Sequence, residues 1–170
     1  MKDIKVYKLD KNELIIFDPE LHLDLKSDLK IEEKHEYYDD KKIQATMCYH
    51  ENLLHGPATF YSAVGNVLSI TWFFMGKRNG RVYRYYNSSK RYSKEIYIND
   101  LLEGEQKYFF EDGTKKTVMN YKDGVLDGEV LLFFENSSIK RHLIFKNGEK
   151  LQDKIFDESG KVLDESKFAL

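Results

Sequence analysis

Cysteine and histidine, the residue types that bind transition metals, gather in one short stretch of the chain. Cys48, His50 and His55 lie close together, and His35 lies a short way upstream. Cys48 and His50 are two residues apart, so in a strand both would project from the same face. The C-x-x-C and H-x-x-x-H spacings that are typical of zinc sites do not occur. We therefore expect no metal and no other cofactor, and we interpret Cys48 as a small buried hydrophobic residue.

Residues for nucleophilic or acid–base catalysis form no motif in this sequence. It contains no glycine-flanked serine elbow, phosphate-binding loop or dinucleotide-binding fingerprint. Paired carboxylates can act as acid and base, and three adjacent pairs occur, each in a predicted turn: Asp39-Asp40, Glu111-Asp112 and Asp157-Glu158. Charge at a turn is usually only solvated surface. The sequence therefore offers no catalytic residue and favours a protein that is not an enzyme.

The most unusual stretch is basic. Residues 77–94 hold seven basic residues and no acidic one, with tyrosines interleaved, although the net charge of the chain is only −2. Positions that are apolar in the other copies of a 24-residue repeat, described below, are basic in this stretch. Arg and Tyr are also enriched at binding hot spots. We predict a site for an acidic partner protein, with Arg84 at its centre. The predicted binding residues are Arg78, Arg81, Tyr83, Arg84, Tyr86, Arg91, Tyr92 and Lys94.

Other interpretations of the basic run remain open. Its side chains could lay their stems on the sheet and reach water with their charged ends. They could also pair with residues 1–40, which hold 7 basic and 12 acidic side chains. A third interpretation is a module that binds anionic lipid or phosphate, although no exposed apolar anchor accompanies the charge. A net charge of −2 disfavours nucleic acid as the partner.

A 24-residue repeat must position all of these residues. The repeat glycines Gly56, Gly80, Gly104 and Gly128 are each 24 residues apart. An aromatic residue follows each by five positions: Tyr61, Tyr85, Phe109 and Phe133. A turn-forming residue follows each by twenty: Gly76, Asp100, Gly124 and Gly148. In-phase copies of this kind indicate a repeat architecture.

Each repeat has the pattern of a β-hairpin. In the third, residues 105–110 and 115–121 alternate like strands, and residues 111–114 and 122–124 are turns in which glycine supplies positive φ. Two strands and two turns leave no room for a helix. We predict an all-β fold, an antiparallel meander of tandem 24-residue hairpins forming one extended sheet. The aromatic columns should be its scaffold, with Phe109→Ala or Phe133→Ala costing about 3–5 kcal/mol.

Three segments are expected along the chain. Residues 1–31 form a strand-rich N-terminal cap with strand-like runs at 4–9, 13–17 and 21–25. Residues 32–151 form the array, whose copies are 32–55 (degenerate), 56–79, 80–103, 104–127 and 128–151. Residues 152–170 form a degenerate capping repeat. Atypical ends are expected because terminal units must face water on one side.

At this point the pattern resembles a known family. Gly104 to Gly113, followed by Tyr121-Lys122-Asp123-Gly124, is similar to the MORN repeat in its bacterial variant form, and the likeness covers about residues 32–160. The second repeat departs from the pattern, with Ser89 and Asp100 where glycine is usual. The resemblance implies an antiparallel β-repeat sheet used for binding. Bacterial members are often labelled antitoxin-like, and eukaryotic relatives are associated with membrane lipids or proteins.

Composition sets the cellular context. A single cysteine gives no intrachain disulfide and favours a reducing compartment, and no signal-peptide pattern or apolar run of about 18–20 residues occurs. We therefore expect a cytoplasmic protein and leave its oligomeric state open. The leading hypothesis is a non-enzymatic protein-binding module, an antitoxin-like or inhibitor-like neutraliser. The alternative is a module that binds anionic lipid or phosphate through residues 77–94.

Overall fold

The computed structural model describes residues 6–9, 12–15 and 31–168, and every regular element within them is a β-strand. β1 (Val6–Leu9) and β2 (Asn12–Ile15) pair as a two-stranded antiparallel sheet. They correspond to two of the expected N-terminal strands, while residues 21–25 lie outside the described residues. Over the described ranges there is no helix long and apolar enough to cross a membrane.

The other strands keep the phase of the sequence repeat. One series of strands begins at residues 43, 67, 91, 115 and 139, and the strands that alternate with them begin at 53, 77, 101, 125 and 149, so both series advance by 24. Their bounds are β3 (Glu32–Tyr37), β4 (Ile43–His50), β5 (Leu53–Tyr61), β6 (Val67–Phe74), β7 (Lys77–Tyr85), β8 (Arg91–Ile98), β9 (Leu101–Leu102), β10 (Gly104–Phe109), β11 (Lys115–Lys122), β12 (Val125–Phe133), β13 (Ile139–Lys146), β14 (Glu149–Phe156) and β15 (Val162–Lys167).

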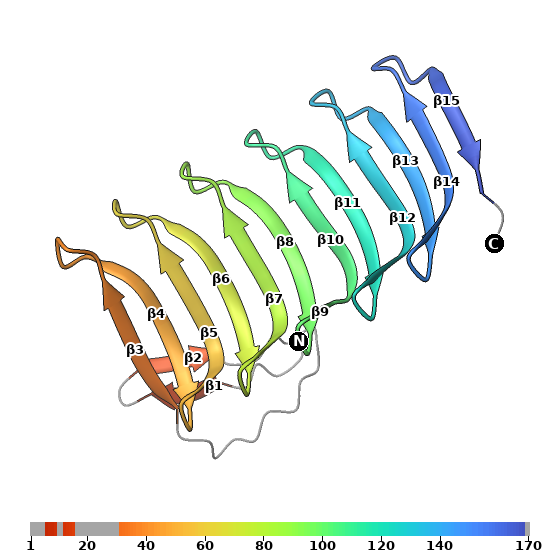
Figure 1. The fold of residues 1–170 in the computed structure, drawn as a ribbon. Helices are drawn as coiled ribbons and strands as arrows, with labels where there is room; N and C mark the ends of the chain where they lie inside the picture. The colour runs from red at the N-terminus through yellow and green to blue at the C-terminus, as the bar shows by residue number, and fades with distance from the viewer. Residues whose placement is uncertain (1–5, 10–11, 16–30, 169–170) are drawn as a thin grey trace. The chain divides into compact units, whose positions relative to one another are not determined.

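The chain divides into two compact units. The first comprises Met1–Ser89 and Tyr97–Asp100, and the second comprises Lys90–Ile96 and Leu101–Leu170. The main sheet of the first unit has the order β7-β6-β5-β4-β3, and that of the second has the order β15-β14-β13-β12-β11-β10-β8. Neighbours in these orders are antiparallel and follow one another in the chain, as Figure 1 shows. The predicted all-β antiparallel meander is confirmed.

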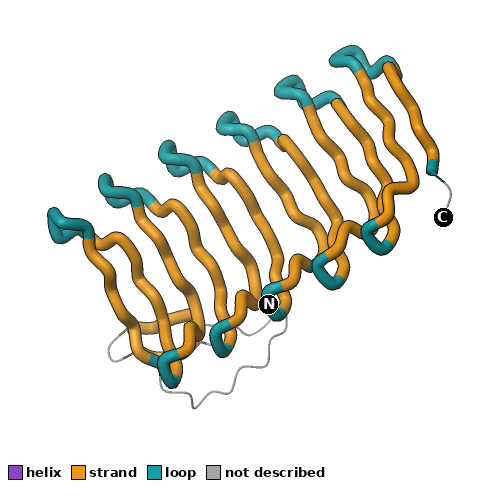
Figure 2. Tube along the Cα trace, in the orientation of Figure 1, coloured by secondary structure: helices purple, strands orange, loops and turns teal. Residues whose placement is uncertain are grey.

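Turns of two kinds join the strands (Figure 2). At one end of the strands the turns have two residues, and both residues have positive φ, as in Met75-Gly76 and Asn99-Asp100. This is the geometry of the type I′ turn, which matches the twist of paired strands. At the other end the turns are longer: the Phe110 N–H donates to the Thr114 carbonyl, and the Gly113 N–H donates to the Phe110 carbonyl.

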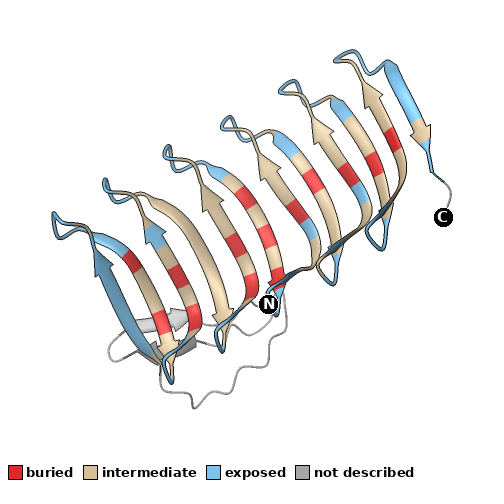
Figure 3. Cartoon of the chain, viewed as in Figure 1, coloured by how far each residue is buried: buried red, intermediate tan, exposed pale blue. Residues whose placement is uncertain are grey.

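The buried positions lie within the strands rather than at their turns, and many are small (Figure 3). Ala45, Ala58 and Val82 are at most 1% exposed. Phe109 and Phe133, by contrast, are only half-buried. The expected cost of truncating either to alanine therefore falls to about 1–2 kcal/mol, because only part of each ring leaves water on folding. The aromatic columns line the sheet, whereas the fully buried positions hold small residues such as Ala58 together with the polar side chains of His55, Glu95 and Gln106.

The strand register of the first unit defines two faces. Residues paired across neighbouring strands project to the same side, and successive residues of a strand alternate. Thr71 pairs with Val82 and Ser69 pairs with Arg84, so these four share one face, called here the Val82 face. Ile70 pairs with Tyr83 on the opposite face, called here the Tyr83 face.

Candidate functional site

The predicted basic site falls in both units of the chain. Arg78, Arg81, Tyr83 and Arg84 belong to β7, and Tyr86 directly follows that strand, all within the first unit. Arg91, Tyr92 and Lys94 lie in the part of β8 that belongs to the second unit. The structure brings some of these side chains together and separates others, as follows.

Arg78 is held by the next two-residue turn. Its backbone N–H and its Nε–H each donate to Oδ1 of Asp100 at 3.0 Å. These hydrogen bonds lower the pKa of the Asp100 carboxyl. The guanidinium carbon also lies 4.1 Å from the centre of the Tyr97 ring, a cation–π contact. The unusual Asp100, which replaces a repeat glycine of the turn series, therefore has a structural role in fixing Arg78.

Arg81 and Tyr83 form the polar centre of the Tyr83 face. Arg81 Nη1 donates to the Tyr83 hydroxyl at 2.9 Å, and both side chains are half-buried. The positions that match Arg81 in the next two repeats hold Glu105 and Glu129. Glu105 Oε1 lies 2.6 Å from Lys107 Nζ, and Glu129 Oε1 lies 3.1 Å from His142 Nε2. The second repeat therefore reverses the charge that its successors carry at this position.

Arg84 lies on the Val82 face, across the sheet from Tyr83. Its neighbours along the cross-strand row are Ser69 and Phe60. The sequence alternation predicted that Arg84 and Tyr83 would point to opposite sides, and the register agrees. A flat partner that contacts Arg81 and Tyr83 directly would leave Arg84 on the other side of the sheet.

The remaining predicted residues have other settings. Lys94 pairs across strands with Lys107, and the Tyr92 ring meets the Tyr108 ring edge to face, with centroids 5.8 Å apart. Arg91 is exposed at the start of β8. The Tyr86 carbonyl accepts a hydrogen bond from the Ser89 N–H, so Tyr86 closes the long turn after β7.

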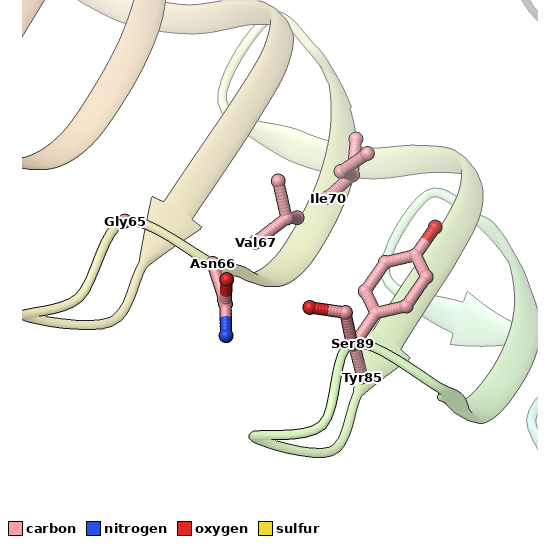
Figure 4. A pocket seen from close by; sticks show the side chains of 6 residues that line it. All are labelled: Gly65, Asn66, Val67, Ile70, Tyr85 and Ser89. Atoms are coloured by element: carbon pink, nitrogen blue, oxygen red, sulfur yellow. The ribbon is translucent and has the colours of Figure 1, made fainter.

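A shallow hollow adjoins the Tyr83 face, and sequence reasoning missed it. It has a volume of about 380 Å³ and is lined by Gly65, Asn66, Val67, Ile70, Tyr85 and Ser89. The lining comes from two successive hairpins: four residues from the first, and Tyr85 and Ser89 from the second (Figure 4). Asn66 Nδ2 donates to the Asn87 carbonyl at 2.9 Å and so ties the two turns at its rim. Column comparison would have shown Val67 and Ile70 as aliphatic where the next repeat has Arg91 and Lys94.

Cys48 and the nearby histidines do not assemble a metal centre in the part of the chain that the structure describes. Cys48 is buried, and burial raises the pKa of its thiol to about 12. His55 is also buried, with its ring 5.9 Å from that of His50 and 5.1 Å from that of Phe74. Burial, and secondarily the neighbouring His50, lowers the pKa of His55. A buried, protonated thiol suits packing, and the lowered pKa of His55 keeps its imidazole neutral.

The acidic pairs occupy turns, as predicted, and one carboxylate in each has a structural contact. Asp112 Oδ1 accepts from the Thr114 N–H and from its hydroxyl, and these bonds lower the pKa of Asp112. Asp157 Oδ1 accepts from Ser159 in the same way. Asp40 accepts from the Lys42 N–H. These contacts are turn stabilisation, the usual role of aspartate at such positions.

The family model described as MORN repeat variant matches residues 102–123, a segment that runs through β10 and β11 into the following turn. A search of curated proteins finds no match to the chain. The matched segment belongs to the repeat whose glycines and aromatic residues resemble the MORN repeat in the sequence. Residues 102–123 are therefore similar to the MORN repeat variant, which confirms the resemblance for this repeat.

Proposed function

We propose that this protein is a non-enzymatic binding module that docks on another protein through the Tyr83 face of its first unit. Its role is that of an antitoxin-like or inhibitor-like neutraliser, which acts by covering a partner's surface. The MORN repeat variant supports this at the level of class, since such repeats bind membrane lipids or proteins. The described carboxylates and histidines discussed above serve turns and packing, which agrees with a protein that binds rather than catalyses.

The observation that carries the proposal is the pair formed by Arg81 and Tyr83. The guanidinium, with Nη2 buried and Nη1 donating to the tyrosine hydroxyl at 2.9 Å, places a positive charge beside an aromatic ring in one fixed arrangement. These are the two side-chain types most enriched at protein–protein hot spots. The arrangement is specific to the second repeat, because Glu105 and Glu129 hold the matching position in the following repeats. An acidic patch on the partner would complement it.

The placement of charge favours a protein over a membrane as the partner. Arg81 lies on the Tyr83 face, whereas Arg78 and Arg84 pair with residues of the Val82 face. A planar anionic membrane would meet one of these faces only, so it would gain only part of the charge of the basic run. A folded partner with a local acidic patch needs only the Arg81 side. A cytoplasmic location fits the lone, buried Cys48, which requires no oxidising compartment.

Site-specific photo-crosslinking in the native host tests this function. Benzoylphenylalanine placed at Tyr83 should form a discrete crosslinked protein band, identified by mass spectrometry. The matched control carries the same photoreactive residue at Leu131, which holds the same place two repeats later. A band at position 83 that is absent at 131 supports the proposal. Crosslinks to lipid alone, together with flotation on anionic vesicles, would contradict it in favour of the lipid-binding alternative.

A further inference from the structure

We propose that the hollow lined by Val67, Ile70 and Tyr85 is an anchor pocket that accepts one aliphatic side chain from an acidic segment of the partner. This inference rests on the proposed function and specifies what the Tyr83 face recognises. It assigns the hollow and the Arg81–Tyr83 pair to one bipartite site. The hollow supplies apolar contact, and Arg81 supplies charge.

The register of the sheet joins the two parts of the site. Ile70 lines the hollow and is also the cross-strand partner of Tyr83. Tyr85, which lines the hollow, follows Tyr83 by two residues on β7 and therefore projects from the same face. Arg81 donates to the hydroxyl of Tyr83. Hollow, tyrosine and guanidinium thus form one continuous strip on the Tyr83 face of the first unit.

The chemistry of the lining limits what the hollow can accept. Val67, Ile70 and the Tyr85 ring make its walls apolar, and Asn66 and Ser89 place polar groups at its edge. The Asn66 amide already donates to the Asn87 carbonyl. A volume of about 380 Å³ lies near the lower end of the range of about 300–1,000 Å³ typical of small-molecule sites. The open hollow, walled by two aliphatic side chains and one aromatic ring, can accept a single aliphatic side chain.

Comparison of the repeats shows that the aliphatic pair Val67 and Ile70 beside Arg81 has no equivalent in the neighbouring repeats. The two aliphatic lining positions, Val67 and Ile70, become Arg91 and Lys94 in the next repeat. Two repeats on, they become Lys115 and Val118, and one repeat earlier they are Ile43 and Thr46. Both positions are aliphatic only beside Arg81. An apolar pocket next to a cation indicates a ligand with an apolar anchor flanked by carboxylates.

Two synthetic heptapeptides test the inference with the 170-residue chain. Each has three acidic residues on either side of a central residue, which is leucine in one peptide and alanine in the other. Binding is measured by fluorescence anisotropy and by the NMR signals of the Val67 and Ile70 methyl groups. We expect the leucine peptide to bind about tenfold more tightly, because burying the larger side chain removes more apolar area from water. We also expect only the leucine peptide to shift both methyl signals strongly.

Two variants separate the parts of the site without disturbing the fold, because each introduces a residue that another repeat carries at that position. Val67→Lys should abolish the preference for leucine over alanine while retaining binding of both acidic peptides. Arg81→Glu should weaken both peptides and retain the leucine preference. Amide spectra of both variants should remain those of the folded protein.

The possible failures are distinguishable. Equal binding of the two peptides, with loss of both in Arg81→Glu, would overturn the anchor pocket and leave the proposed function standing. Peptide affinities that Arg81→Glu leaves unchanged would count against the proposed function. No binding of either peptide at millimolar concentration, or methyl shifts confined to residues away from Val67 and Ile70, would overturn the anchor pocket.

Discussion

Gly80 lies opposite Trp72 in the sheet, so close that a Cβ on the glycine would stand 2.9 Å from the Cβ of the tryptophan. The register explains the approach. Thr71 pairs with Val82 and Phe73 pairs with Arg78, so three residues of β7 oppose Trp72 alone. Gly128 meets Asn120 in a similar bulge in the second unit, where a Cβ would come within 3.2 Å of the asparagine Cβ. Gly80 and Gly128 thus mark bulges in which a side chain would crowd the residue opposite, whereas a Cβ at Gly104 would meet nothing within 4 Å.

Alanine at Gly80 should be one of the most damaging single methyl additions in the chain. Its φ of +127° is disfavoured for a residue with a side chain, and the added Cβ would overlap Trp72. We expect a loss of about 2–5 kcal/mol of unfolding free energy, combining backbone strain and overpacking. Gly65→Ala is the control: its φ is +89° but nothing lies within 4 Å of the new Cβ, so about 1–2 kcal/mol should be lost. Equal losses by urea denaturation would refute the steric role of Trp72.

Much of the fold could be predicted from the repeat because its signals are local. Glycine and asparagine in the two-residue turns and alternation in the strands depend on neighbours within one hairpin. The bulge at Gly80 could not be predicted, because it depends on which residue of the preceding strand opposes the glycine. Nor could the half-buried state of Phe109, since period-two alternation indicates a face but not how deeply that face is covered.

Ser89 and Asp100 both have left-handed backbone conformations, and replacing each with glycine gives a paired test of their roles. Ser89 has φ +65° and Asp100 has φ +70°, at positions where the third repeat has Gly113 and Gly124. Ser89→Gly should stabilise the protein by about 0.5–1 kcal/mol, because it relieves strain at a turn. Asp100→Gly relieves similar strain but removes the acceptor of two Arg78 hydrogen bonds, so no net gain is expected. Thermal melts that show equal gains would mean that the Arg78–Asp100 contact contributes nothing.

An ion cluster around the buried carboxylate of Asp153, in the second unit, should make stability depend on acid. Asp153 is 8% exposed and accepts from Arg141 at 2.8 and 2.6 Å and from Lys150 at 2.9 Å. The Arg141 hydrogen bonds, assisted by Lys150, hold the pKa of Asp153 below its ordinary value of 3.8.

Because the folded pKa lies below the unfolded one, the stabilisation is complete above about pH 4 and decreases as pH falls toward the folded value. Asp153→Asn should therefore lose about 1–3 kcal/mol at neutral pH. Its denaturation midpoint should also vary less with pH between 2 and 5 than that of the wild type. An identical pH profile in the variant would show that other carboxylates govern the acid response.

The thiol of Cys48 should resist modification in the folded protein. Burial raises its pKa to about 12, so almost none is thiolate at neutral pH, and the thiolate is the reactive form. Iodoacetamide should label it only after denaturation, and Cys48→Ala should leave partner binding unchanged. Fast labelling of the native protein at pH 7 would contradict this assignment.

The candidate site was harder to predict than the fold. The charge of the basic run and the opposite orientation of Tyr83 and Arg84 could be predicted from strand alternation. The capture of Arg78 by Asp100 could not, because these residues are 22 positions apart and meet only when β7 lies beside the next turn. The hollow depends on Tyr85 and Val67 approaching across two hairpins, a relationship that no single repeat contains.

The yield of the position-83 photo-crosslink measures whether the Tyr83 face binds a protein through Arg81. Arg81→Glu places a residue natural to this column, so the fold should be kept while the local charge is reversed. Like charges facing each other at an interface cost several kcal/mol, so the yield should fall at least about tenfold. Arg84→Glu on the opposite face should reduce it much less, and Lys115→Glu in the third repeat should leave it unchanged. Equal crosslink yields from wild type and Arg81→Glu, with both proteins folded, would contradict binding of the partner through Arg81.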